Sequence, residues 1–182
     1  MFFLTVAGVL GTMLLYYLEN GTWGGTSFFG SILLIPLFFI PIAKLYRISY
    51  EKMMDYVAPS ICMMLFVMKF SCMISGCCSG RRINLLLSEK SMIFPSQIVE
   101  AVVVLMIMIV LLYVEKQKLF EGEIYPLLLV LYGTTRFVLN FFRADLSSFV
   151  WGIPAGHFWS LIAIFISTVT FIIRNAKKKS FD

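Results

Sequence analysis

Residues 98–114 read IVEAVVVLMIMIVLLYV, and the only charged side chain among them is Glu100. A helix crosses the hydrocarbon core of a bilayer with about 20 mostly apolar residues, within a range of about 17–25. Backbone groups in lipid must be paired within the segment, and the alternation typical of a membrane barrel strand is absent. The sequence therefore predicts an all-α integral membrane protein, a bundle of six transmembrane helices. The other five spans are expected at about residues 1–18, 26–43, 56–76, 124–142 and 154–173.

The composition excludes the other broad classes of protein. Of the 182 residues, 60% are hydrophobic and 14% are charged, whereas soluble domains average about 45–50% and about 25%. Disordered chains are poor in apolar residues and rich in charge, so disorder is excluded too. The formal net charge is +5, but the basic residues are scattered between apolar runs and form no nucleic-acid-binding domain. No linker or low-complexity tract interrupts the chain, and we expect one polytopic membrane domain over residues 1–182.

The distribution of lysine and arginine predicts the orientation of this bundle. Three basic residues follow the second span, two follow the fourth and four lie in the tail, which places nine on one side. Four lie on the opposite side, and two lie within spans. Cytoplasmic loops carry the excess of basic residues, so both termini are expected in the cytoplasm. The first span lacks the basic segment of a signal peptide, and we expect it to be retained.

Three predicted spans carry one charge each, and all three charges lie in the outer half of the membrane. A charge at mid-membrane costs about 2.5–3.5 kcal/mol on insertion scales, so Lys69, Glu100 and Arg136 are candidates for a functional site. Positions three or four apart share a helix face. Such faces carry Tyr132, Arg136, Asn140 and Arg143 on one span, Lys69, Cys72 and Gly76 on another, and Gln97 with Glu100 on a third.

If these faces converge, they form a cationic pocket that opens toward the outer leaflet and contains one carboxylate. The planar fork of arginine donates two parallel hydrogen bonds, which suits it to hold a phosphate. The alternative is structural: Glu100 neutralises Arg136 or Lys69 and stiffens the bundle, and Arg143 and Arg81 anchor helices at the membrane interface.

The cysteines and the single histidine have weaker signals. Cys62 lies in the inner half of its span, where we expect it to pack. Cys72, Cys77 and Cys78 cluster on the outer side, where oxidation could pair them, but their spacing does not indicate a metal site. His157 lies near the outer start of the last span, as an interfacial hydrogen-bonding residue or as part of the site.

Four motifs, in the same order and spacing, resemble those of the prolipoprotein diacylglyceryl transferase family. Residues 94–101 (FPSQIVEA) look like its His-Pro-Thr-Gln-Leu-Tyr-Glu-Ala motif, and residues 132–143 (YGTTRFVLNFFR) look like its Tyr-Gly-x-x-Arg-Phe-x-x-Glu-Phe-x-Arg motif. Residues 69–80 (KFSCMISGCCSG) and 24–30 (GGTSFFG) resemble its central Gly-Arg-x-Gly-Asn-Phe-x-Asn-Gly and its Gly-Gly…Phe-His-Gly-Gly elements. The resemblance covers residues 22–173.

The resemblance implies a reaction in the bacterial inner membrane. Members of the family transfer a diacylglyceryl group from phosphatidylglycerol to the lipobox cysteine of a preprolipoprotein, and glycerol phosphate is the leaving group. No metal or other cofactor is implied. The family has seven spans, so this chain is expected to be a short member without the first span. Lys69, Glu100 and Arg136 are expected to be catalytic, and the residues expected to bind substrate are Gln97, Tyr132, Asn140, Arg143, Cys72 and Arg81.

The chain departs from the motifs of the family at five positions. Phe29 and Phe94 replace family histidines, Lys69 replaces an arginine, Cys72 an asparagine and Asn140 a glutamate. The phosphate-binding half of the site is therefore expected to be present, and the half that would deprotonate the thiol is altered.

Loss of a histidine base need not abolish transfer, because a thiol with a pKa of about 8.5 is already partly ionised near neutral pH. Glu100 is one candidate base if burial raises its pKa. The alternatives are a phospholipid-binding membrane protein without catalysis, and a transferase for another head group or acceptor.

Overall fold

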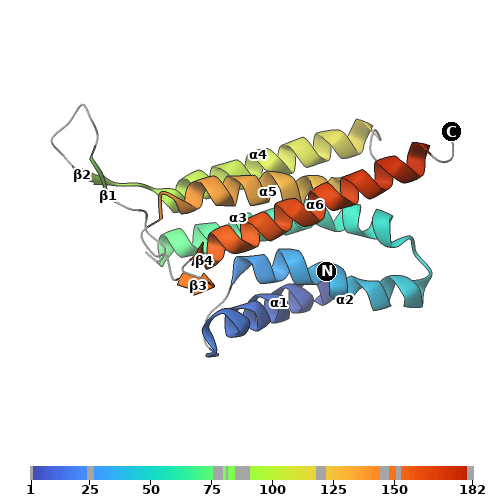
Figure 1. Ribbon diagram of the computed structural model, residues 1–182, viewed down its shortest axis with the longest axis horizontal. Coiled ribbons are helices and arrows are strands. Elements are labelled where there is room, and N and C mark those ends of the chain that lie inside the picture. The colour runs from blue at the N-terminus through green and yellow to red at the C-terminus, as the bar shows by residue number, and fades with distance from the viewer. Residues whose placement is uncertain are drawn as a thin grey trace.

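The computed structural model describes residues 2–23, 27–75, 80, 82–84, 91–117, 122–143, 148–150 and 153–179. In these residues six α-helices run mostly along the long axis of the molecule (Figure 1). They are α1 (Phe2–Asn20), α2 (Phe28–Tyr46), α3 (Tyr50–Ile74), α4 (Ser96–Gln117), α5 (Ile124–Asn140) and α6 (Ala155–Lys179).

Four of these helices, α2, α3, α4 and α6, are long and apolar enough to cross a membrane, and α5 is a shorter apolar helix of 17 residues. The all-α membrane architecture expected from the sequence agrees with this arrangement. The count of six spans and the cytoplasmic position of both termini stay predictions. On α4 the buried residues Glu100, Val104, Ile107 and Leu111 form one face, while Met106 and Ile109 are exposed on the opposite side, as in a helix that faces lipid.

The helix ends differ from the predicted span ends by up to six residues, as at the end of α6 (Lys179 against 173) and at the start of α3. This helix begins at Tyr50, six residues before the predicted span. Its first turns contain the charged residues Glu51, Lys52 and Asp55. A search for apolar runs leaves them out because it finds the part of a helix that lies in hydrocarbon, and a helix can extend beyond that part.

Two short hairpins, which the sequence did not predict, lie at the end of the bundle that the sequence predicts to face outward, and we call it the outer end. Strands β1 (Arg82–Asn84) and β2 (Ser91–Ile93) pair antiparallel, as do β3 (Ser148–Val150) and β4 (Ile153–Pro154). Figure 1 shows both at the end where α4 and α6 begin. Strands of two or three residues are too short to give a period in the sequence. An isolated bridge between Gly80 and Arg143 joins the segment before β1 to the end of α5.

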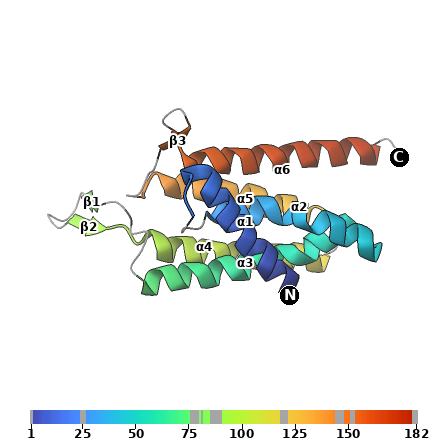
Figure 2. The same cartoon turned by 90° about the horizontal axis from the view of Figure 1, so that it is seen from below.

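Helix α1 crosses α2 obliquely (Figure 2), and the two backbones meet at a pair of glycines. A Cβ atom on Gly30 would clash with the carbonyl group of Gly11, so this approach requires glycine. Small residues at such crossings are common in membrane proteins because they let two helices pack closely. The Ser27 amide, at the start of α2, donates to the Thr12 carbonyl at 3.0 Å.

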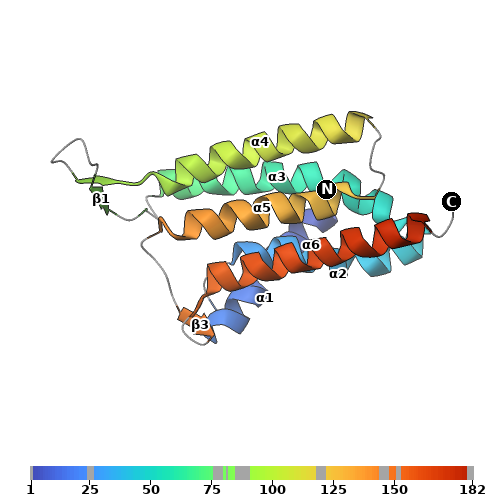
Figure 3. The same cartoon turned by 45° about the horizontal axis from the view of Figure 1, so that its top comes forward.

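Helix α5 is the centre of the bundle, between α4 and α6 and in contact with both (Figure 3). The buried carboxylate of Asp55 in α3 accepts hydrogen bonds from the amides of Gly122, Ile124 (3.0 Å) and Tyr125 (3.2 Å). The first amides of a helix have no partner within the helix, so a side chain of α3 caps α5.

Candidate active site

Lys69, Glu100 and Arg136 meet in the outer half of the bundle, although each comes from a different helix. Glu100 Oε2 lies 2.9 Å from Lys69 Nζ and 2.8 Å from Arg136 Nη1. The side chains of Lys69 and Glu100 are 2% exposed and that of Arg136 is 8% exposed. The three form a buried ion cluster, to which we refer as the Glu100 cluster.

Tyr132 completes the contacts of this carboxylate. Its hydroxyl group donates to Glu100 Oε1 at 3.3 Å, and the side chain lies one helical turn before Arg136 on the same face of α5. The ring of Phe29, from α2, packs on Tyr132 with a centroid distance of 5.9 Å. Both carboxylate oxygens of Glu100 are therefore engaged, one by two cations and the other by a phenol.

The cluster has an excess of positive charge. Arg143 lies at the outer end of α5, half-buried, and its charge acts on Lys69, Glu100 and Tyr132. Together with Arg136 these side chains carry three positive charges and one negative charge. Buried charges interact strongly where the dielectric constant is low. An anion that entered this part of the bundle would thus be attracted by a net charge of +2.

Asn140 lies on the same face of α5, one turn beyond Arg136 toward the outer end. It is 2% exposed, and its Nδ2 atom has no hydrogen-bond partner within the described part of the chain. Helix α6 approaches α5 here, and a Cβ atom on Gly156 would overlap the Asn140 amide group. The sequence did not single out Gly156 as a close contact, because only the helix crossing reveals it.

His157 follows Gly156 and is 8% exposed. Its ring packs edge-on against Phe137 and Phe141, with centroid distances of 5.2 and 4.7 Å. Neither Nδ1 nor Nε2 has a hydrogen-bond partner among the residues described. His157 therefore packs against the end of α5 that carries Asn140, near the candidate site.

The other predicted substrate-binding residues lie around the same end of the bundle. Gln97 is half-buried in the first turn of α4, three residues before Glu100, and half-buried Cys72 lies three residues beyond Lys69 in α3. Arg81 lies outside the described residues, as do Cys77 and Cys78. Among the described residues, no group of three or more His, Cys, Asp or Glu side chains is placed to hold a metal ion.

The two positions where the resemblance expects histidine have phenyl rings in apolar contacts. Phe29 is buried against Tyr132, and Phe94 packs on Phe142 with a centroid distance of 5.0 Å. Neither ring can accept or donate a proton. The imidazole that does lie at this end of the bundle, His157, belongs to α6.

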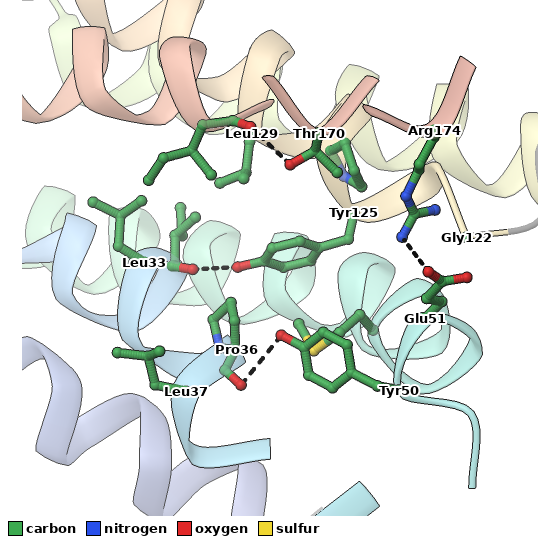
Figure 4. A pocket seen from close by; sticks show the side chains of 14 residues that line it. Leu33, Pro36, Leu37, Tyr50, Glu51, Gly122, Tyr125, Leu129, Thr170 and Arg174 are labelled. Carbon is green, nitrogen blue, oxygen red and sulfur yellow. Dashed lines mark hydrogen bonds and ion pairs between the residues drawn. The ribbon is translucent and has the colours of Figure 1, made fainter. Parts of the chain in front are cut away.

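A separate cavity of about 260 Å³ lies toward the opposite end, between α2, α3, α5 and α6 (Figure 4). Its walls are mostly apolar, and the Tyr50 and Tyr125 hydroxyl groups are bound to the carbonyl groups of Pro36 (3.2 Å) and Ile32. An ion pair of 3.5 Å between Arg174 and Glu51 lies at its edge.

The distance along α5 separates this cavity from the ion cluster. Tyr125 and Leu129 line the cavity, and they precede Arg136 by eleven and seven residues. At a rise of 1.5 Å per residue the separation along the helix is about 10–16 Å. The cavity is therefore separate from the Glu100 cluster, and its mostly apolar walls make it a hydrocarbon-like space.

The fold and the site together define a multi-pass helical membrane protein with a cluster of three buried charged side chains, Lys69, Glu100 and Arg136, near one end of the bundle. Residues 1–173 match the family model for prolipoprotein diacylglyceryl transferase, and the chain belongs to that family. The match confirms the resemblance seen in the four motifs, and it also includes the residues before position 22.

Known relatives are similar to the chain at low identity. It is 25% identical over 138 residues to the phosphatidylglycerol–prolipoprotein diacylglyceryl transferase of Clostridium tetani, covering 70% of this chain and 55% of that protein. The enzymes of the same name from Idiomarina loihiensis (28% over 183 residues) and Acinetobacter baumannii strain SDF (28% over 159 residues) are also similar. These alignments cover 90% and 76% of this chain. The chain spans 55–67% of the length of these three relatives.

Proposed function

We propose that the protein transfers a diacylglyceryl group from phosphatidylglycerol to the thiol of a cysteine in a prolipoprotein or peptide, in the inner membrane of a bacterium. The observation that carries this proposal is the buried Glu100 cluster, with Lys69 and Arg136 on one carboxylate oxygen and Arg143 nearby. The family and the names of the relatives support the same activity.

In the proposed reaction the cysteine sulfur attacks the glyceryl carbon that is bonded to the phosphate oxygen. The new S–C bond forms as the C–O bond breaks, and the electron pair of that bond leaves on glycerol phosphate. Arg136 and Lys69 would hold the phosphate and stabilise the charge that develops on it, as preorganised cations do. Arginine can bind two oxygens at once, whereas lysine acts as a point charge.

Glu100 would act in this site mainly by positioning. Because Oε2 contacts two cations and Oε1 accepts from Tyr132, this carboxylate fixes three side chains from two other helices around one point. To take the thiol proton as a base, Glu100 would first have to release one of these partners. The thiol proton would pass to Glu100 after such a release. Where the cysteine is ionised before the attack, its proton has already passed to water.

A second candidate function is phospholipid binding without catalysis. It is favoured by Phe29 and Phe94, which occupy the two family histidine positions with rings that pack on Tyr132 and Phe142. In that case the anion site persists and the thiol chemistry is lost. A transferase that uses another head group or acceptor would share the same scaffold.

The experiment that separates these functions is a transfer assay in liposomes with labelled phosphatidylglycerol and a lipobox peptide. We expect lipidated peptide and released glycerol phosphate, both lost in Arg136→Ala. Arg174→Ala is the matched control, because it removes a cation that pairs with Glu51 at the other end of the bundle. Phospholipid binding that depends on Arg136, without product for any donor or acceptor tried, would establish the non-catalytic function instead.

A further inference from the structure

Two buried polar side chains near the Glu100 cluster have hydrogen-bonding atoms without a partner in the described part of the chain. They are the amide nitrogen of Asn140 and both ring nitrogens of His157, none of which has a partner among the described residues. Asn140 and His157 are 2% and 8% exposed. The large majority of buried side-chain polar atoms in proteins are hydrogen-bonded, so each exception calls for an explanation.

Both side chains lie at the contact between α5 and α6. Gly156 leaves space for the Asn140 amide, and His157 is the next residue along α6. The imidazole ring is held between Phe137 and Phe141, three residues before and one residue after Asn140. The contact between α5 and α6 thus contains a polar spot with unsatisfied atoms from both helices beside aromatic rings, and a Cβ atom at position 156 would overlap the Asn140 amide group.

The chemistry of this spot is neutral and differs from that of the cluster one turn away. A neutral imidazole has one donor and one acceptor, and the Asn140 amide nitrogen is a donor. A hydroxyl group both donates and accepts, so it can satisfy these atoms. An ammonium group can only donate, and the net positive charge of the cluster would repel it.

The spacing matches a phosphate that carries a short polyol. Asn140 follows Arg136 by four residues on one helix face, a separation of about one turn or 5.4 Å. A three-carbon chain attached to a phosphate at Arg136 can span this distance. We infer that Asn140 and His157 bind the hydroxyl groups of a glycerol head group, and so select a hydroxylated phospholipid among anionic ones. This inference rests on the proposed function, because it requires the phosphate at Arg136.

The test compares two lipids that differ only in these hydroxyl groups. Phosphatidylglycerol and phosphatidylpropanol carry the same phosphate charge and a three-carbon head group, and the second has no hydroxyl. We would measure their relative occupancy on the purified protein in detergent by native mass spectrometry with equimolar lipids. With about 0.5–1.5 kcal/mol for each net hydrogen bond, the wild-type protein should prefer phosphatidylglycerol by about tenfold.

Variants assign this preference to the two residues. We expect Asn140→Leu and His157→Leu each to lower the preference to about threefold, and the double variant to lower it to about one. His157→Gln keeps a donor and an acceptor and should retain most of the preference. Phe141→Leu is the matched control, because it changes the packing around His157 without removing a hydrogen-bonding atom.

A structural role predicts a different result. If Asn140 and His157 serve only stability, the leucine variants will change the melting temperature while the lipid preference stays constant, and the inference is wrong. Equal binding of both lipids to the wild-type protein, lost in Arg136→Ala, would also overturn the inference and leave the phosphate site intact. Absence of any binding that depends on Arg136 would overturn the phosphate site, and the head-group site with it.

Discussion

Lys69 and Arg136 contact the same oxygen atom, Glu100 Oε2, at 2.9 and 2.8 Å, although they lie on α3 and α5. One carboxylate therefore holds two cations that would otherwise repel each other in a buried environment. The arrangement links three helices at one point. The negative charge of Glu100 is therefore needed to stabilise both cations inside the bundle.

Replacing Glu100 with glutamine should destabilise the protein by about 3–5 kcal/mol, because it leaves two buried cations without their counter-ion. Thermal unfolding in detergent measures this effect. The double variant Glu100→Gln/Lys69→Met removes one cation as well and should recover at least half of the loss. If the single variant is as stable as the wild type, the charge of Glu100 does not stabilise Lys69 and Arg136 in the bundle.

Tyr132→Phe tests the remaining contact of the carboxylate. The variant keeps the aromatic ring that packs on Phe29 and removes the hydroxyl group that donates to Glu100. We expect a loss of stability of about 1 kcal/mol and, if the cluster is catalytic, a fall in kcat larger than the change in KM. Steady-state transfer kinetics over a range of phosphatidylglycerol concentrations would show this split. A change in KM alone would indicate that Tyr132 contributes to lipid binding only.

Phe29→His introduces the residue that the family resemblance expects at this position. Because Phe29 is buried against Tyr132, an imidazole there should cost about 1–3 kcal/mol of stability unless it finds a hydrogen-bond partner. The proposed reaction does not need it, so turnover should rise by no more than about threefold. The transfer assay and thermal unfolding of the same preparation give both quantities. A rise of 100-fold or more would mean that the chain lacks only this base.

Asp55→Ala should weaken the connection between α3 and α5. The Asp55 carboxylate accepts from the amides of Gly122, Ile124 and Tyr125, so alanine would leave three buried donors at the start of α5 without this acceptor. We expect a loss of at least 2 kcal/mol, at the upper end of helix-cap effects. Glu51→Ala, an exposed carboxylate one turn earlier on α3, is the control and should cost less than about 1 kcal/mol. Similar melting temperatures for the two variants would refute the capping role.

Gly30→Ala should separate α1 from α2, because a Cβ atom at this position would clash with the backbone of Gly11. We expect destabilisation of about 1–3 kcal/mol, as for other overpacked contacts. Gly8→Ala is the control on α1, since its Cβ atom would make ordinary van der Waals contacts, with the flexible side chain of Met64 at 3.4 Å and with Ser31 Cβ at 3.9 Å. Equal effects of the two substitutions on the unfolding temperature would contradict the close crossing at Gly11 and Gly30.

The sequence predicted the positions of the helices well because apolar length is a local property. The run around Val104 and Leu111 has to be a helix in lipid, whatever it packs against. Helix α3 begins at Tyr50, before the span expected from residue 56, because Asp55 and its charged neighbours can continue a helix but do not count toward an apolar run. The two hairpins lie between the apolar runs, where short strands have no recognisable pattern.

For the candidate site, helical spacing could group Tyr132, Arg136 and Asn140 on one face, because this also depends only on local geometry. The sequence could not predict that Lys69 and Arg136 share one oxygen atom, or that Gly156 lies against Asn140. Both facts depend on how three or four helices cross. The positive charges were visible in the sequence, and the unsatisfied atoms of His157 were visible only in the packing.

Helix α2 contains a proline at position 36, which cannot donate a hydrogen bond to the carbonyl group of Ile32 one turn earlier. The Tyr125 hydroxyl group of α5 donates to this carbonyl oxygen instead. A proline usually leaves this carbonyl group without a helical partner and weakens the helix at this point. Here a side chain of the neighbouring helix supplies the partner, so a change in the bend of α2 would strain the hydrogen bond to Tyr125 at the start of α5. Since Tyr125 also lines the cavity of Figure 4, a change in the bend of α2 at Pro36 would move a wall of that cavity.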